Sequence, residues 1–565
     1  MIRLPRPRSA RPACPPRHFW PKTLPLATAV ALWGLGGAQL SAQDMTVGKG
    51  ALRLGGLAAP SSLLRHAPTA MPAPQRGRAG LSLDSHDGLG GLGGLGQAAQ
   101  DADPTLLYAA FRKEIGAPLI PQAEAASQAE AVPAPAVALQ RPSAKAELSE
   151  GSLNTALTWL AVMAGPSNFA PIMAARAGED TAIYITGGTA DLATLAKAGL
   201  PGLYAVEDGV VVERPLVLWN DAALRMEPGE TLYLSRAAGA FVLAFGTLEL
   251  QGATIASTRP VNPHLASYEP FVTVAGQGVL LAEHAAFIGL GAQGSTNGTG
   301  SVGTTGMGAM AGLSISSGLL YHAEETSRIS ESQFLDVAEL RVEGVDGFSL
   351  TDSQFEGRTR EGVVLRNLAK AEIRNVAFRT TGSASALELA GLRQSRIEQN
   401  SFAAGSGGIL VSGGSQALRL RQNMLLKPLA TGLEIRDSRC VLVEQNLVVG
   451  AGTTALRLNH ADAVTIHQNG FLQARTAAVE LVDMAAGGLS LSDNLMAHNR
   501  EGLRGDRPAR LHLQGNRLAA QFPRLMSGPV ASQQPAWLAA QKAHTALSLT
   551  TPTAAPSVAP SCEGI

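Results

Sequence analysis

Arginine is concentrated in the middle of this chain, between residues 358 and 421. Ten basic residues fall in this stretch against four acids, a local balance of +6, although the formal net charge of the whole chain is zero. A guanidinium group can match a carboxylate with two parallel hydrogen bonds, so a run of arginines suits an anionic polymer. We select as candidate polymer ligands Arg358, Arg360, Arg366, Arg393 and Arg396. The alternative interpretation is an ordinary solvated face with scattered charges.

Candidate proton-abstracting groups are few. Tyr321 and His322 are adjacent, and His264 follows an Asn-Pro pair. Tyrosine and histidine can act as general bases where position and pKa suit the proton, but paired polar residues in a loop are more often only solvated. No spacing of cysteines or histidines indicates a metal site, and we predict no metal and no cofactor.

An asparagine recurs down the second half of the chain at nearly equal intervals. The series is Asn375, Asn400, Asn423, Asn446, Asn469, Asn494 and Asn516. An interval in the low twenties predicts a solenoid. We interpret the series as a structural ladder rather than a catalytic set, because an asparagine in a turn can donate to and accept from its neighbour one coil away.

One period, from Thr431 to Gly450, contains three short runs of alternating apolar residues separated by turns. Alternation with a period of two predicts strands, and no run is long enough for a helix. Three strands and three turns are typical of one coil of a right-handed parallel β-helix, whose inward residues stack on those of the next coil. The sequence therefore predicts an all-β fold of the pectate-lyase-like solenoid type, with the β-helix at residues 201–520.

The ends of the chain differ from the repeats. Residues 1–42 combine a basic region, an apolar run and a small-residue cleavage site, which together predict a signal peptide and a periplasmic or secreted protein. Residues 43–150 are rich in Ala, Gly, Pro and Ser and are predicted to form a disordered linker. Residues 151–200 predict a small α/β cap, and residues 521–565 a helix at 536–547 and a disordered tail.

The three cysteines predict no disulfide framework. Cys14 would be removed with the signal peptide, and Cys562 lies in the tail. We interpret Cys440, inside a coil, as a small core residue. Charged residues make up only 16% of the chain, which with zero net charge argues against nucleic-acid binding.

Five segments of the cap and the first coils occur in a characteristic order: Tyr184–Lys197, Val212–Leu218, Leu232–Leu243, Glu269–Val274 and Gly312–Ser316. Together they resemble the periplasmic mannuronan C5-epimerases, the alginate epimerase family. The resemblance implies a right-handed β-helix and an isomerase that inverts C5 of a uronate. That reaction needs a base, a cation that stabilises the developing negative charge, and a proton donor on the opposite face.

The catalytic motif of that family is not matched. The family's base is the histidine of an Asp-Pro-His-Asp-Arg motif, and the matching coil here runs from Glu361 to Leu368. The motif's first Asp falls on Val364, its His on Arg366, its second Asp on Asn367 and its Arg on Leu368. The resemblance therefore implies a family member without the family's catalytic groups.

Three hypotheses follow from the sequence. The first is an exported, non-catalytic β-helix protein that binds an acidic polysaccharide, with an export or biosynthesis complex as a further partner. The second is an active C5-epimerase or polysaccharide lyase with a rearranged site, in which Arg366 or Arg393 neutralises the carboxylate and Tyr321 or His322 is the base. The third is a surface adhesin or structural solenoid. We expect a monomer with no membrane span after signal removal.

Overall fold

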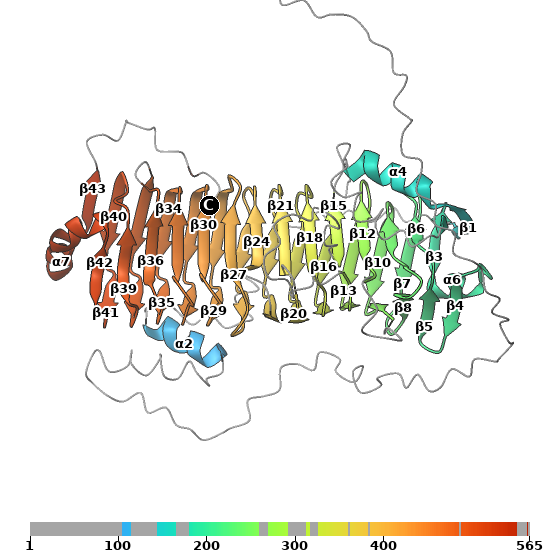
Figure 1. The fold of residues 1–565 in the computed structure, drawn as a ribbon, viewed down its shortest axis with the longest axis horizontal. Coiled ribbons are helices and arrows are strands. Elements are labelled where there is room, and N and C mark those ends of the chain that lie inside the picture. The colour runs from blue at the N-terminus through green and yellow to red at the C-terminus, as the bar shows by residue number, and fades with distance from the viewer. Residues whose placement is uncertain are drawn as a thin grey trace, which may run out of the picture. The chain divides into compact units, whose positions relative to one another are not determined.

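Three parallel sheets contain most of the described residues of this computed structural model (Figure 1). The structure describes residues 104–114, 144–164, 180–258, 269–291, 312–316, 326–359, 362–381, 385–484, 487–521, 523–550 and 562. The predicted signal peptide and most of the predicted linker lie outside these residues. No helix in the described ranges is long and apolar enough to span a membrane.

Sheet B contains fifteen strands. In order they are β1 (Glu147–Ser152), β2 (Thr181–Thr186), β6 (Leu216–Leu218), β9 (Val242–Ala244), β12 (Val272–Ala275), β15 (Leu313–Ser316), β18 (Glu339–Glu343), β21 (Gly362–Arg366), β24 (Ser385–Ala390), β27 (Gly408–Ser412), β30 (Leu433–Arg436), β33 (Leu456–Asn459), β36 (Ala477–Val482), β39 (Glu501–Gly505) and β42 (Arg524–Ser527).

Sheet A contains fourteen strands. In order they are β3 (Thr189–Asp191), β7 (Ala223–Met226), β10 (Thr247–Gln251), β13 (Val279–Glu283), β16 (Arg328–Ser330), β19 (Ser349–Thr351), β22 (Glu372–Arg374), β25 (Arg396–Glu398), β28 (Gln416–Arg421), β31 (Arg439–Glu444), β34 (Asp462–His467), β37 (Gly488–Ser492), β40 (Arg510–Gln514) and β43 (Leu547–Thr550).

Sheet C also contains fourteen strands. In order they are β4 (Leu203–Val206), β5 (Gly209–Val212), β8 (Thr231–Leu234), β11 (Thr254–Ser257), β14 (Ala286–Ile288), β17 (Gln333–Leu335), β20 (Gln354–Arg358), β23 (Ala377–Thr381), β26 (Ser401–Phe402), β29 (Met424–Leu426), β32 (Leu447–Val449), β35 (Gly470–Leu472), β38 (Leu495–Ala497) and β41 (Arg517–Ala519).

Each coil contributes one strand to sheet B, then one to sheet A and one to sheet C. Every strand pairs in parallel with its equivalents in the coils before and after it, except β1–β2, β4–β5 and β40–β43 at the ends, which pair antiparallel. The fold is therefore a right-handed parallel β-helix, which confirms the predicted fold class. Apolar side chains from all three sheets fill the interior.

Stacked phenylalanines show how the core repeats from coil to coil. Their ring centroids lie 4.2 to 5.3 Å apart in sheet C, with interplanar angles of 2 to 13°. The stack consists of Phe287, Phe334, Phe355, Phe378 and Phe402. Because strand registers place each ring over the next, a single coil could not bury its own ring, which is the physical basis of the repeat.

The asparagine ladder is present, but it starts at Asn400, one coil later than predicted. The six asparagines from Asn400 to Asn516 are buried in the turn between sheets A and C. Asn423, for example, donates from Nδ2 to the Ile397 carbonyl (2.8 Å) and to Asn446 Oδ1 (2.9 Å). Asn375 instead is exposed, with φ of 54°, and Val376 occupies the buried position. The prediction was therefore wrong for Asn375.

The left-handed backbone of this turn belongs to the residue before each buried asparagine. Gln399, Gln422, Gln445 and Gln468 have φ of 53 to 60°. Their side chains form a second ladder, each Nε2 donating to the next Oε1 at 2.9 to 3.2 Å. The asparagine side chain is therefore needed for its hydrogen bonds. The residue that must adopt the left-handed backbone conformation is the glutamine before it.

The N-terminal cap contains α4 (Leu153–Ala164) and α6 (Leu192–Lys197). Helix α4 packs on the outer face of sheet B through Leu153, Leu157 and Leu160. Asp191 caps α6 by accepting from the Thr194 backbone N–H at 2.6 Å. Strands β2 and β3 lie within the predicted cap range but already pair in the long sheets.

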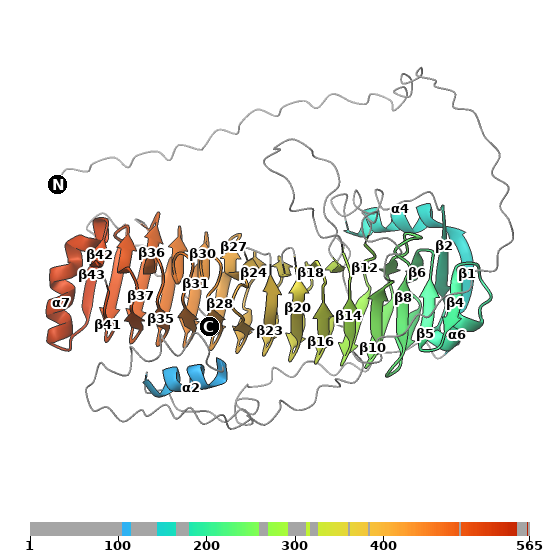
Figure 2. The same cartoon turned by 60° about the horizontal axis from the view of Figure 1, so that its bottom comes forward.

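The predicted linker contains a helix, α2 (Pro104–Glu114), which packs on the outer face of sheet C near its C-terminal end (Figures 1 and 2). The expectation of a linker without structure was therefore wrong for these residues. The missed signal is an apolar pair at i and i+4, Leu107 and Phe111, after a proline at the first helical position.

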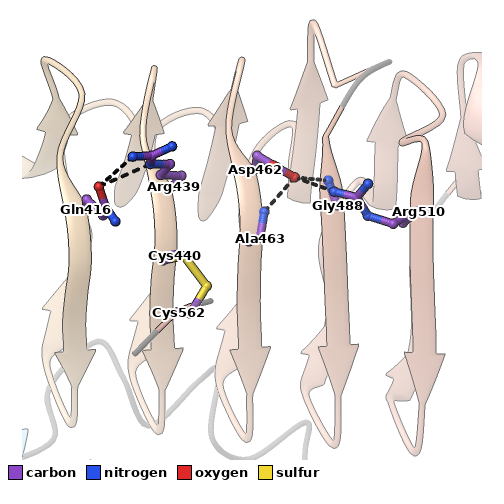
Figure 3. Close-up of a disulfide and its surroundings, with 8 residues drawn as sticks. All are labelled: Gln416, Arg439, Cys440, Asp462, Ala463, Gly488, Arg510 and Cys562. Carbon is purple, nitrogen blue, oxygen red and sulfur yellow. Dashed lines mark hydrogen bonds and ion pairs between the residues drawn. A yellow bond between two sulfur atoms is a disulfide. The ribbon is translucent and has the colours of Figure 1, made fainter. Parts of the chain in front are cut away.

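The C-terminal region also differs from its prediction. Its helix α7 spans Gln534–Lys542 after the 3₁₀ helix η2 (Pro529–Gln533), so it ends before the predicted residue 547. Residues 547–550 form β43, where the sequence predicted the end of the helix and the start of a disordered tail. Cys440 and Cys562 form a disulfide, with Cα atoms 5.4 Å apart (Figure 3). The prediction of no disulfide was therefore wrong. The two cysteines are 122 positions apart, and their spacing does not indicate that Cys562 lies beside β31.

Candidate functional site

The three candidate catalytic residues, Tyr321, His322 and His264, lie outside the described residues. Two further possible bases, His284 and His460, are exposed in turns. His284 Nδ1 lies 3.2 Å from Glu331 Oε2, and His460 Nδ1 lies 2.8 Å from Asp437 Oδ1. Each pair links equivalent turns of neighbouring coils. Because equivalent turns stack on one another along the β-helix, such pairs arise without any catalytic role.

The four positions that align with the family's catalytic motif hold no proton acceptor. Val364 is fully buried in β21, and Leu368 is fully buried in the core. Arg366 forms an ion pair with Glu388 of β24, with Nη2 to Oε1 at 3.1 Å. Asn367 has φ of 57° in the turn after the strand. These four positions supply a cation but no base.

The outer face of sheet B from β18 to β39 is charged and nearly balanced. Five arginines face six glutamates there, a balance of −1. Ion pairs join several of them, such as Arg341–Glu339 at 2.6 Å and Arg436–Glu434 at 2.6 Å. Much of the positive charge on this face is therefore neutralised within the protein.

The five predicted arginine ligands do not share one face. Arg358 ends β20 in sheet C, and Arg366 ends β21 in sheet B. Arg393 and Arg396 lie on sheet A, Arg396 in β25 and Arg393 in an isolated bridge just before it. Arg360 lies outside the described residues. The structure brings together only Arg393 and Arg396.

Sheet A carries a surplus of arginine from β22 to β31. We call this surface the basic face and define it by the arginines Arg374, Arg393, Arg396, Arg419, Arg421 and Arg439. Three glutamates accompany these six arginines, which leaves a balance of +3. Sequence reasoning did not select four of them, although the step from Arg396 to Arg419 equals one coil.

Strand register places the charges of the basic face in columns along the solenoid. Arg396 pairs in register with Arg419, and Glu398 with Arg421. A neighbouring column runs from Arg393 through Gln416 to Arg439, whose guanidinium donates to Gln416 Oε1 at 2.8 and 3.2 Å (Figure 3). Neighbouring coils are separated by about 4.8 Å. Successive cations in these columns lie one coil apart, as in Arg396 and Arg419, or two coils apart, as in Arg393 and Arg439.

The arginines of the basic face differ in how fully they are engaged. The Arg393 and Arg396 side chains are exposed, with no hydrogen bond or ion pair to another described residue. Arg419 and Arg421 share Glu444, at 3.7 and 3.3 Å. The Nε atoms of both are nevertheless buried without a hydrogen-bond acceptor in the described part of the chain, and both are closed to solvent.

The acids of the basic face are partly withdrawn from solvent. Burial raises the pKa of the Glu398 carboxyl, and the nearby charges of Arg419, Arg421 and Arg396 limit the rise. Glu398 and Glu444 side chains are each 18% exposed, whereas Arg419 and Arg421 are 33% and 30% exposed. The positive groups are therefore the more accessible ones on this surface.

The fold and its charged outer faces define a right-handed parallel β-helix protein. Residues 301–483, less than half of the chain, match the family model described as periplasmic copper-binding protein (NosD). No curated protein sequence matches this chain. Among the described residues no three His, Cys, Asp or Glu side chains are grouped as metal ligands.

Among solved structures, the chain is similar to the periplasmic alginate epimerase AlgG at 14% identity, over 73% of this chain and 97% of that chain, with a TM-score of 0.48. A mutant of AlgG gives 15% identity, 73% and 98% coverage and a TM-score of 0.49. A mannuronic acid specific polysaccharide family 6 lyase from human gut microbiota gives 13% identity, 63% and 84% coverage and a TM-score of 0.22.

Proposed function

We propose that this chain is an exported β-helix protein that binds an acidic polysaccharide along the basic face of sheet A. The observation that carries the proposal is the surplus of six arginines over three glutamates there, against a near balance on sheet B. Guanidinium groups recognise carboxylates by paired hydrogen bonds, and a polymer can engage several coils at once.

The polyuronate class is proposed because residues 184–316 resemble the mannuronan C5-epimerases. Export is supported by the sequence of residues 1–42 and by the Cys440–Cys562 disulfide, since disulfides persist in the periplasm and outside the cell. The proposed role is binding rather than catalysis, because Val364, Arg366, Asn367 and Leu368 provide no base where the family has one.

The proposal can be tested by reversing the charge of the two exposed arginines of the basic face. We expect the double variant Arg393→Glu and Arg396→Glu to bind immobilised polymannuronate at least about tenfold more weakly at low salt, a loss of ~1.4 kcal/mol. Wild-type retention should itself fall steeply as salt rises, since exposed charges are screened. The measurement is affinity chromatography or calorimetry at two salt concentrations.

The matched control is Arg366→Glu on sheet B, where the wild-type arginine is paired with Glu388. This variant should retain polymannuronate as the wild type does. Equal loss in the control, or retention of the wild type on a neutral glucan, would place recognition elsewhere than the basic face. No retention of the wild type on polymannuronate at low salt would refute the proposed function.

The proposed absence of catalysis has a direct test. Incubation of the protein with polymannuronate in deuterated water should leave C5 without deuterium and the chain ends saturated, as seen by NMR. Deuterium at C5 would demonstrate epimerisation, and unsaturated ends would demonstrate a lyase. Either signal would establish a rearranged active site and overturn the non-catalytic interpretation.

A further inference from the structure

A second group of basic side chains lies where each coil passes from sheet C back to sheet B. Four successive turns form this corner, at residues 427–432, 450–455, 473–476 and 498–500. These turns contain Lys427, Arg475 and Arg500, and no aspartate or glutamate. Their formal balance is therefore +3, the same surplus as on the basic face. We call this surface the cationic corner and define it by those three residues.

The three cations of the cationic corner are open to solvent. Lys427, Arg475 and Arg500 are all exposed, and none of their side chains forms a hydrogen bond or ion pair with another described residue. Other arginines of the outer faces are paired within the protein, as in Arg436–Glu434 at 2.6 Å. Because no described carboxylate neutralises the charges of the cationic corner, they are available to an anion from outside the protein.

Backbone hydrogen bonds hold these turns in register from coil to coil. The Arg475 N–H donates to the Ala451 carbonyl at 3.2 Å, and the Arg500 N–H donates to the Ala474 carbonyl at 3.3 Å. The two arginines therefore occupy equivalent positions in neighbouring coils, which are separated by about 4.8 Å. The buried Asn499 side chain fastens the turn, since its Oδ1 accepts from the Ala474 N–H at 2.8 Å. The backbone of this corner is thus ordered before any ligand binds, which lowers the entropic cost of binding.

The cationic corner and the basic face lie on different sides of the β-helix. Each coil runs from sheet B to sheet A, then to sheet C and back to sheet B, so the turn from sheet C to sheet B is the corner that does not border sheet A. The apolar interior lies between the two surfaces. A polymer that lies straight along the basic face therefore leaves the cationic corner free for a second chain.

We propose that the cationic corner is a second binding surface for the acidic polysaccharide, and that the protein thereby bridges two polymer chains. This inference rests on the proposed function and extends it from binding one chain to cross-linking two. Both surfaces present guanidinium groups one coil apart, Arg475 and Arg500 here and Arg396 and Arg419 on the basic face. Such spacing suits carboxylates that repeat along a polymer, and a bridged network holds together even when each site is weak.

Light scattering tests the bridging. The full-length protein mixed with polymannuronate at low salt should raise the scattering to a maximum at an intermediate ratio of protein to polymer. Excess protein should lower the scattering again, because each polymer chain is then covered and no site remains for a second chain. Raised salt should abolish the effect, since exposed charges are screened. The protein alone, or mixed with a neutral glucan, should give no such maximum.

Two double variants separate the cationic corner from a general effect of charge. Arg475→Glu with Arg500→Glu should lower the scattering maximum at least about fivefold, because two exposed ion pairs with the polymer are lost. Immobilised polymannuronate should still retain this variant through the basic face. The matched control is Lys197→Glu with Lys542→Glu, which changes the net charge equally at exposed positions of α6 and α7 and should scatter as the wild type does.

The outcomes distinguish this inference from the proposed function. A wild type that is retained on polymannuronate but gives no scattering maximum would overturn the second surface and leave the basic face standing. Unchanged scattering in the Arg475→Glu and Arg500→Glu variant would do the same. A wild type that is not retained at low salt would instead refute the proposed function.

Vesicles of anionic phospholipid form the last arm of the experiment, because Leu429 is 54% exposed in the same turn as Lys427. Polymer bridging without sedimentation on vesicles supports the proposal. Sedimentation of the wild type with these vesicles, lost in the Arg475→Glu and Arg500→Glu variant and unaccompanied by polymer bridging, would assign the cationic corner to a lipid surface and overturn the inference.

Discussion

Replacing Asn423 with alanine is expected to lower the free energy of unfolding by about 3 to 5 kcal/mol, because several buried polar groups lose a partner at once. Asn423 is fully buried and donates to the Ile397 carbonyl and to Asn446 Oδ1. Its own Oδ1 accepts from the backbone and side-chain amides of Asn400, at 3.1 and 2.9 Å. Urea unfolding followed by circular dichroism measures the loss.

Asn375 is the matched control, since it is also an asparagine of the same turn but lies outside the ladder. Its Nδ2 donates to Asp352 Oδ1 at 2.7 Å on the surface, and its φ is 54°. Replacement by glycine removes the amide without backbone strain and should cost about 1 kcal/mol or less. If Asn375→Gly were as destabilising as Asn423→Ala, the buried ladder would not be the source of the effect.

The difference between these two asparagines shows what could be predicted from the sequence. The coil period and the three strands per coil follow from apolar alternation and from the spacing of the asparagines, and the structure confirms them. The residue at which the ladder begins does not follow, because the turn has one left-handed and one buried position and asparagine suits both. The step from Asn375 to Asn400 is longer than the step that follows it, but so is the step from Asn469 to Asn494, where both residues belong to the ladder. The spacing of the asparagines therefore could not show that the buried ladder begins at Asn400 rather than at Asn375.

The candidate arginines were harder to place, for a geometric reason. One coil passes through all three sheets before it returns to the first, so side chains that are close in the sequence can lie on different faces. Arg366 and Arg374 are near each other in the sequence but belong to sheets B and A. Arg396 and Arg419 are one full coil apart and directly in register. Counting basic residues in a stretch of sequence therefore identifies the coils that carry the positive charge. Assigning each arginine to sheet A, B or C also requires the length of one coil.

Opening the Cys440–Cys562 disulfide is expected to produce the other large loss of stability. The bond joins β31 to a residue 122 positions later, near the end of the chain. In the chain-entropy account, a cross-link over a loop of that length stabilises the folded state by about 4 to 5 kcal/mol. Because each coil of a solenoid contacts mainly its neighbours, we expect the loss to fall on the coils that follow Cys440 rather than on the whole β-helix.

Cys562→Ser is the informative variant, because it removes the bond and leaves the buried Cys440 side chain in place. Its unfolding midpoint should equal that of the reduced wild type, and adding reductant to the variant should change nothing further. Hydrogen exchange should show early opening from β34 to β43, with β7 to β28 as protected as in the oxidised wild type. A reduced wild type as stable as the oxidised form, or a thiol titration that finds Cys562 free under oxidising conditions, would show that the tail is not fastened to the β-helix in solution.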